Sequence, residues 1–372
     1  MADLRLNPAA LGTLSAAWFI AFALMQIPVG LALDRFGPRR TVAVLMCFAV
    51  LGALLFAHAE TMSAAIAGQL LIGIGCAPVF VGTMVAVARW FPPERFATLS
   101  SIILACASAG TLMSSRPFAM AAEWLGWRGA TTAVAGATLF SLLLVALLAR
   151  GPAGVPESAD TSESVAELFG GLRAVASLRE LWPILPMAFT AYAVMITLRG
   201  LWAGPYLAEV FQLSPVARGD VLLIMSLALP AGTMIYAWAE RRWHNRRWPV
   251  LSGGILTIAC LAALVALGDR SLTLSAAALT LFVAGGATYV LIMTQGRQFL
   301  PSRQVGRGIT LLNFANFLGA AILQQASGLV AQRAGDLGQP PSAVYGWVFA
   351  FLAACLAIAT AVYFRSHDKP AI

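Results

Sequence analysis

The stretch GLALDRFGPRR, residues 30–40, places one acid, three arginines and two turn formers between two long apolar runs. The whole chain is 60% hydrophobic and 11% charged, whereas soluble proteins are about 45–50% apolar and about 25% charged. Each apolar run is long enough to cross a hydrocarbon core of roughly 30 Å as a helix. The composition therefore predicts an all-α polytopic membrane protein.

Apolar runs recur along the chain and predict about eleven membrane spans. They lie near 9–33, 41–58, 62–88, 97–121, 129–149, 182–207, 219–239, 249–268, 273–296, 308–331 and 342–364. The longest polar interruption separates five spans from six and is rich in Pro, Gly, Ser and acids at its start. We expect an N-terminal bundle over 1–150, a cytoplasmic linker over 151–180 and a C-terminal bundle over 181–372. The linker carries either a short amphipathic helix on the inner membrane surface or no regular structure.

The net charge of +8 would suit a nucleic-acid-binding protein if the chain were soluble. Most of the 24 Lys and Arg residues, however, lie on alternate loops, and the positive-inside rule places those loops in the cytoplasm. The charge therefore predicts a multi-pass inner-membrane protein with a cytoplasmic C-terminus, and nucleic acid is not needed as a partner. No Walker loop, metal-ligand cluster or catalytic triad pattern occurs in the sequence, so we expect neither an enzyme nor a cofactor.

Two charge patterns occur once in each half of the chain. An acid followed by basic pairs appears at Asp34, Arg35, Arg39 and Arg40 and again at Glu240, Arg241, Arg246 and Arg247. An arginine three residues before a threonine appears at Arg95 and again at Arg307. The order and spacing of both patterns agree, which favours a duplicated bundle whose halves rock about a site near the bilayer midplane.

The pattern G-x-x-x-D-R-x-G-x-R-R, on the basic side between two spans, resembles the signature loop of the major facilitator superfamily of secondary transporters. That family has two six-helix halves, and its signature follows the second helix. Only one span precedes the signature here, which leaves a count of five spans plus six. The resemblance implies that the chain as given lacks the family's first helix, through a start codon assigned too late or through a real absence.

The resemblance also implies roles for the loop residues. Asp34 would hold the cytoplasmic side closed by contacting Arg89 or Arg95 and the N-terminal end of the helix near Gly308, where the helix dipole favours an anion.

Three further features of the loop follow from the same resemblance. Gly30 would permit close approach of helices, and Gly37 with Pro38 would make the tight turn. The three arginines have an equally good alternative as topology determinants facing lipid head groups: Arg35, Arg39 and Arg40.

Ionisable residues inside a membrane are functional candidates by default. Arg199 lies in a span loosened by Gly200, Gly204 and Pro205, where transporters expose groups to a cavity. Facing that cavity, it would attract an anionic substrate. In the alternative interpretation, its long side chain extends along the helix so that the charged group reaches the outer membrane interface. Tyr192 and Trp202 would offer stacking or hydrogen bonds, and Arg116 is a second basic candidate with the same two interpretations.

Polar uncharged residues in the spans either line the pathway or form interhelical hydrogen bonds. They are Gln26, Tyr289, Asn313, Asn316, Gln324 and Gln325. No acid lies near the centre of a span, so a proton-coupling group would belong to the absent helix or to an interface, as Glu209 or Glu123 do.

We therefore expect a monomeric secondary transporter of a small anionic solute, organic or inorganic, that works by alternating access. Its partners would be the solute, the lipid bilayer and a coupling proton or ion. The alternatives are a drug or metabolite exporter of the same superfamily and a non-transporting relic or membrane scaffold.

Overall fold

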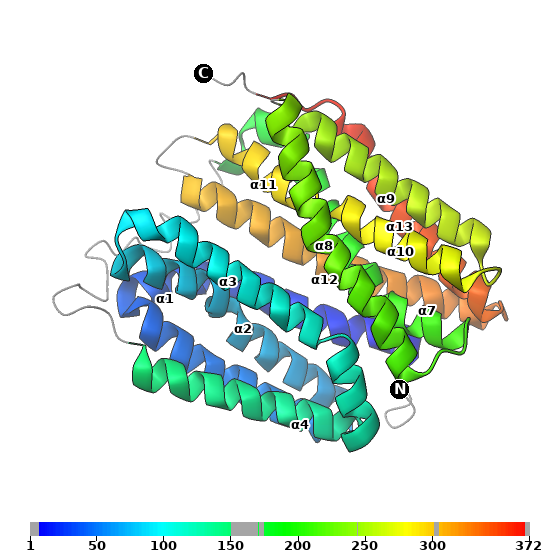
Figure 1. Ribbon diagram of the computed structural model, residues 1–372, viewed down its shortest axis with the longest axis horizontal. Coiled ribbons are helices and arrows are strands. Elements are labelled where there is room, and N and C mark those ends of the chain that lie inside the picture. The colour runs from blue at the N-terminus through cyan, green and yellow to red at the C-terminus, as the bar shows by residue number, and fades with distance from the viewer. Residues whose placement is uncertain (1–6, 150–169, 171–174, 244, 301–304, 369–372) are drawn as a thin grey trace. The chain divides into compact units, whose positions relative to one another are not determined.

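A computed structural model of the 372-residue chain describes residues 7–149, 170, 175–243, 245–300 and 305–368. Regular structure in these ranges is helical, with no strand (Figure 1). Ten helices of the described chain are long and apolar enough to cross a membrane, which confirms an all-α polytopic protein. The predicted linker over 151–180, with its candidate amphipathic helix, lies largely outside the described residues.

The chain forms two compact units. Unit 1 comprises residues 1–4 and 17–167, and unit 2 comprises residues 5–16 and 168–372. Unit 1 is built mainly from α1 (Pro8–Ala57), α2 (Met62–Trp90), α3 (Pro93–Met113) and α4 (Arg116–Leu148).

The first two predicted spans are the two arms of α1, which is broken at Gly37. Gly37 has φ +78° and ψ 167°, a conformation that residues with a Cβ adopt only under strain. Pro38 follows and is buried, like Gly37. The hydroxyl of Thr41 donates to the carbonyl oxygen of Ala32 over 2.9 Å. Two arms can therefore run on either side of one short turn.

The predicted span 97–121 is wrong as a continuous helix, because α3 ends at Met113 and α4 begins at Arg116. Pro117 has no N–H to donate to the carbonyl four residues earlier, and its ring crowds that carbonyl. The hydroxyl of Ser114 instead donates to the carbonyl oxygen of Thr111 over 2.7 Å. A second break at Gly126, with φ +69°, divides α4, so the predicted span 129–149 is its C-terminal arm.

Close contact between helices in unit 1 depends on glycines. A Cβ built on Gly52 in α1 would lie 2.6 Å from the carbonyl oxygen of Gly68 and 2.7 Å from the backbone nitrogen of Ile72 in α2. Small residues at helix crossings let backbones approach closely in membranes, where van der Waals packing replaces the hydrophobic effect. The second arm of α1 therefore packs directly on the backbone of α2.

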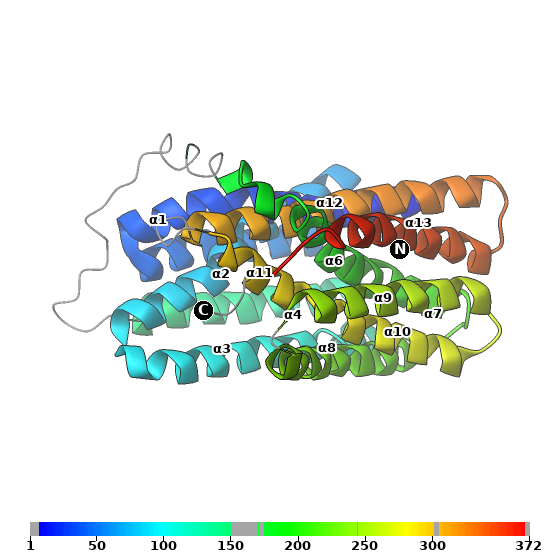
Figure 2. The same ribbon diagram turned by 90° about the horizontal axis from the view of Figure 1, so that it is seen from above.

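Unit 2 carries the remaining helices. In chain order they are η1 (Arg179–Leu181), α6 (Leu185–Thr197), η2 (Leu198–Trp202), α7 (Ala203–Glu209), α8 (Pro215–Trp243), α9 (Arg247–Leu267), α10 (Leu272–Gly286), α11 (Tyr289–Gln298), α12 (Val305–Asp336) and α13 (Pro341–Tyr363). In this unit α12 packs along α6, α13 packs on α9, and α10 packs between α8 and α9 (Figure 2). Large side chains such as Tyr206, Phe282 and Phe349 are fully buried in its core.

The predicted span 182–207 is one helical path with a π-helical turn, η2, between α6 and α7. The N–H of Ala203 donates to the carbonyl of Leu198, five residues earlier. Pro205 cannot donate to the carbonyl of Leu201, so the α-helical bonding pattern cannot continue through this segment. Single π turns of this kind are frequent at functional sites.

Candidate functional site

Arg199 lies in the π turn η2 and is held by one hydroxyl group of a neighbouring helix. Its Nη2 donates to Oγ of Ser226 on α8 over 2.7 Å, and that Oγ donates to the carbonyl oxygen of Leu222 over 2.7 Å. Nε of Arg199 is buried and has no hydrogen-bond partner within the described part of the chain. Because Ser226 is uncharged, this hydrogen bond leaves the positive charge of the guanidinium available to a ligand.

A cluster of aromatic rings is centred on Tyr192, which lies near this arginine. The ring centroids of Tyr192 on α6 and Tyr289 on α11 are 5.3 Å apart, and those of Tyr192 and Phe317 on α12 are 5.5 Å apart. Tyr192 is close enough to Arg199 for an electrostatic interaction. The structure thus brings together three of the predicted pathway residues, Tyr192, Tyr289 and Arg199, and adds Phe317. Three helices, α6, α11 and α12, contribute to this aromatic wall.

Trp202, which we expected to contact a substrate, is a core residue instead. Its side chain is only 2% exposed, and its Nε1 donates to Oγ of Ser327 over 2.9 Å. Its ring packs edge-on against Tyr345, with centroids 6.1 Å apart. Because its donor is used and its faces are covered, Trp202 fixes the π turn to α12 and α13 and does not offer a surface to a ligand.

The predicted polar residues of α12 all lie within unit 2. Asn316 and Gln324 are buried, whereas Asn313 and Gln325 are half-buried. Oε1 of Gln324 is buried with no partner among the described residues. A buried acceptor without a partner is costly, which makes Gln324 a candidate for contact with a polar ligand.

Two further candidates lie in unit 1. The amide nitrogen of Gln26 donates to the carbonyl oxygen of Phe22, one turn earlier in its own helix, over 3.3 Å. We expected Arg116 to lie within a span, and it is the first residue of the candidate span α4 and is exposed. The break caused by Pro117 places it there.

The signature loop forms one of the two contacts expected of its acid, the one with an arginine. Nη2 of Arg89, in the last turn of α2, donates to Oδ1 of Asp34 over 2.9 Å, and its Nη1 donates to the carbonyl oxygen of Leu33 over 3.4 Å. The alternative partner Arg95 is exposed on α3. This pair ties the turn of α1 to the end of α2 within unit 1.

Among the other loop residues, the arginines make contacts of their own and Gly30 differs from expectation. Nη2 of Arg39 donates to the carbonyl oxygen of Ala146 over 2.5 Å, so it caps the C-terminal turn of α4, where a cation also meets the negative end of the dipole. Arg35 lies over the ring of Phe36 at 5.4 Å, and Arg40 is exposed. Gly30 makes no close helix contact, because a Cβ built on it would have no neighbouring atom within 4 Å.

The second copy of the signature is paired differently from the first. Nε of Arg246 donates to Oε1 of Glu240 over 2.5 Å, so acid and base of the same loop pair with each other. Nη2 of Arg247 donates to the carbonyl oxygen of Phe364 over 2.5 Å, and its guanidinium lies over the ring of that residue at 5.0 Å. Arg241 is exposed, and the side chain of Arg307 lies outside the described residues.

Asp368, near the C-terminus, was missed by the sequence reasoning. Its Oδ2 accepts from the backbone N–H groups of Arg246 and Arg247, over 2.7 and 3.0 Å, and its Oδ1 accepts from Nε2 of Gln295 over 2.9 Å. Oε1 of Gln295 in turn accepts from the hydroxyl of Tyr363. The carboxylate therefore caps the N-terminus of α9 and joins it to α11. No local signal marks this role, because the three partners are distant in sequence.

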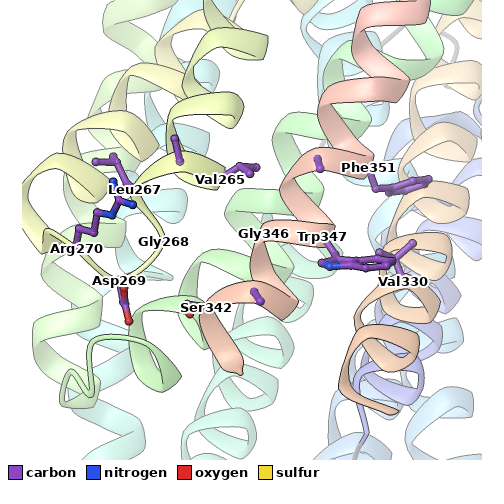
Figure 3. A pocket seen from close by; sticks show the side chains of 13 residues that line it. Val265, Leu267, Gly268, Asp269, Arg270, Val330, Ser342, Gly346, Trp347 and Phe351 are labelled. Atoms are coloured by element: carbon purple, nitrogen blue, oxygen red, sulfur yellow. The ribbon is translucent and has the colours of Figure 1, made fainter. Parts of the chain in front are cut away.

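A groove of about 800 Å³ lies in unit 2 at the ends of α9 and α13 (Figure 3). Its lining is largely apolar, with Trp347 and Phe351 of α13 near Val330 of α12, and with Asp269 and Arg270 on the α9–α10 loop. None of the residues that line it is one of the predicted pathway residues. The groove is therefore distinct from the candidate site at Arg199.

Comparison with known proteins identifies the family. The model of the Major Facilitator Superfamily matches residues 1–324. A putative tartrate transporter of Agrobacterium vitis is 23% identical over 354 residues, covering 90% of this chain and 81% of that protein. The nitrate/nitrite transporter NrtP of Picosynechococcus is 33% identical over 113 residues, which cover 30% of this chain but only 21% of that protein.

Among solved structures, a mutant of the nucleoside transporter NupG has the same fold, with a TM-score of 0.80 at 13% identity, covering 98% of this chain and 92% of the other. Members of this family are membrane transporters and not enzymes, in agreement with the sequence. The match to the family model extends over most of the chain, from the signature loop to α12. This chain belongs to the Major Facilitator Superfamily.

Proposed function

We propose that the protein is a secondary transporter that moves a small organic acid anion across the inner membrane by alternating access. The observation that carries the proposal is Arg199, a half-buried arginine in a π turn with a buried Nε–H that has no partner among the described residues. A cation within a membrane span is costly, and an anionic ligand would offset that cost.

The aromatic wall favours an organic anion over an inorganic one. Tyr192 lies near the arginine and packs against the rings of Tyr289 and Phe317, and aromatic surfaces suit a carbon skeleton better than a fully polar ion. The relatives agree with this preference, because the match to a tartrate transporter covers 90% of the chain and the match to a nitrate/nitrite transporter covers 30%. A small carboxylate is therefore the proposed cargo.

The Asp34–Arg89 pair is proposed as part of the inner gate. It joins the turn of α1 to the end of α2 at 2.9 Å, at the loop that the positive-inside rule places in the cytoplasm. The pair is partly exposed, with the carboxylate side chain 56% accessible. It can therefore open without a large desolvation change, as a latch in a repeating cycle must.

Uptake into proteoliposomes tests the cargo. Purified protein would be assayed with tartrate, nitrate and the drug cation ethidium, each with and without an imposed pH gradient. We expect tartrate uptake that falls about 10- to 100-fold in Arg199→Gln, because charge-assisted hydrogen bonds contribute about 1.5–3 kcal/mol. Arg333→Gln is the matched control, since Arg333 is exposed in the last turn of α12 and the same charge is lost.

The outcomes separate the alternatives. Nitrate uptake without tartrate uptake would refute the organic cargo, and ethidium transport that survives Arg199→Gln would favour an exporter of drugs. If the protein carries none of the anions, or if Arg199→Gln behaves like Arg333→Gln, the anion site at Arg199 is wrong. A pH gradient that accelerates tartrate uptake would identify the proton as the coupling ion.

A further inference from the structure

We propose that Ser226 on α8 positions Arg199 for anion binding, so that the arginine presents its Nε–H and a second N–H to two oxygens of one oxyanion. This inference rests on the proposed function, because it assigns the residue that orients the binding group. Ser226 would be a positioning residue, which acts on the substrate only through Arg199.

The hydrogen bonds of Ser226 show that its hydroxyl acts as an acceptor toward Arg199. A serine hydroxyl has one hydrogen and two acceptor lone pairs. Its hydrogen is donated to the carbonyl oxygen of Leu222, one turn earlier in α8, over 2.7 Å. The oxygen must therefore accept from Nη2 of Arg199, which lies 2.7 Å away. Ser226 is 3% exposed, so its position is fixed by the packing of α8.

A neutral partner orients the arginine without neutralising it. An aspartate or glutamate at this position would pair with the guanidinium and compete with an anionic substrate. A serine hydroxyl accepts a hydrogen bond from the arginine without carrying a negative charge, so it does not neutralise the guanidinium. The guanidinium is a rigid planar fork, so fixing one of its nitrogens restricts the directions of the others.

The donor that remains is of the type that binds a planar oxyanion. Nε–H of Arg199 is buried and finds no partner in the described ranges, and the bond to Ser226 uses only Nη2. Carboxylates bind arginine through two parallel N–H donors. The N–H parallel to Nε–H is on Nη2, which carries two hydrogens. A carboxylate with one oxygen on Nε–H and the other on the Nη2 hydrogen that Ser226 does not use would satisfy the buried donor. Tyr192 would then lie beside the carbon chain of the ligand.

Three substitutions at one position test the inference in the proteoliposome assay with tartrate. We expect Ser226→Ala to raise KM about tenfold, the effect of losing roughly one charge-assisted hydrogen bond, with kcat changed less than about twofold. Ser226→Thr keeps the hydroxyl and should restore KM. Ser226→Asp should abolish uptake, because its carboxylate would occupy the guanidinium.

The matched control is Ser252→Ala. The hydroxyl of Ser252 on α9 also donates to a carbonyl of its own helix, that of Pro249, over 2.8 Å, and the residue is exposed. Its loss should leave KM unchanged. A purely structural role for Ser226 would reduce the amount of folded protein without separating KM from kcat, and threonine would not correct the difference specifically in KM.

The failures of the two proposals are distinguishable. If Arg199→Gln abolishes uptake but Ser226→Ala leaves KM at the wild-type value, the positioning role is wrong and the proposed function stands. If neither change affects uptake, both are wrong. If Ser226→Ala does not elute as a folded monodisperse species, Ser226→Thr and Ser226→Asp decide, and wild-type KM in the aspartate variant overturns the inference.

Discussion

Replacing Asp368 by alanine is expected to release the C-terminal segment from α9 and α11. The carboxylate accepts two backbone N–H groups at the start of α9, over 2.7 and 3.0 Å, and the amide of Gln295, over 2.9 Å. An N-terminal cap contributes about 0.5–2 kcal/mol. The buried Nε2 of Gln295 would keep only its longer hydrogen bond of 3.4 Å to the carbonyl oxygen of His367, and the loss of one hydrogen bond costs about 1 kcal/mol. The change should therefore lower the stability of this region by about 1.5–3 kcal/mol.

Hydrogen–deuterium exchange in detergent measures the effect locally. The peptide covering 245–250 contains the two capped amides, and each 1.4 kcal/mol of lost stability corresponds to about tenfold faster exchange. We expect at least a tenfold increase in Asp368→Ala. The matched control is Asp336→Ala, because Asp336 accepts a single exposed hydrogen bond from Gln332 over 2.8 Å. Its loss should change stability by less than about 0.5 kcal/mol.

Two results would refute this reasoning. Exchange of the 245–250 peptide at the wild-type rate in Asp368→Ala would show that the carboxylate does not cap α9. Equal effects of Asp368→Ala and Asp336→Ala would show that the effect follows from loss of charge and not from the three hydrogen bonds.

Two further predictions concern unit 1. Gly52→Ala should destabilise the protein by about 1–3 kcal/mol, because the added Cβ would lie 2.6 Å from a backbone oxygen of α2. The control Gly136→Ala, whose Cβ would have no atom within 4 Å, should be neutral or stabilising by up to about 1 kcal/mol. Equal melting temperatures of the two variants would contradict the close contact. Asp34→Asn should lower the stability by at most about 1 kcal/mol, since the ion pair of Asp34 with Arg89 is partly exposed. The same change should reduce tartrate uptake severalfold. Unchanged uptake would argue against the gating role.

Membrane spans and turns could be predicted from the sequence because their causes are local. An apolar run of sufficient length must be helical in a bilayer, since no other partner satisfies its backbone groups. The break at Gly37 and the π turn at η2 were both signalled by Gly and Pro residues nearby. The failure at 97–121 has the same local origin, because Pro117 interrupts an otherwise apolar stretch.

The role of an individual side chain could be predicted only where the sequence offered few candidate partners for it. The pair Asp34–Arg89 was expected from the family signature, and the structure forms it. Trp202 was misjudged, because its position in the loosened span says nothing about Ser327 and Tyr345, which bury it. Gly30 was also misjudged: we expected a close helix contact there, but a Cβ built on it would have no atom within 4 Å.

By itself, the sequence determined the class of the protein, its order of spans and the signature loop GLALDRFGPRR, because apolar length, turn formers and charge act over a few residues. Only the tertiary structure decided that Ser226 holds Arg199 and that Asp368 joins α9 to α11. Those contacts link residues that are distant in the chain. Their partners depend on how helices rotate and cross, which is set by the packing of whole helices and not by any local pattern.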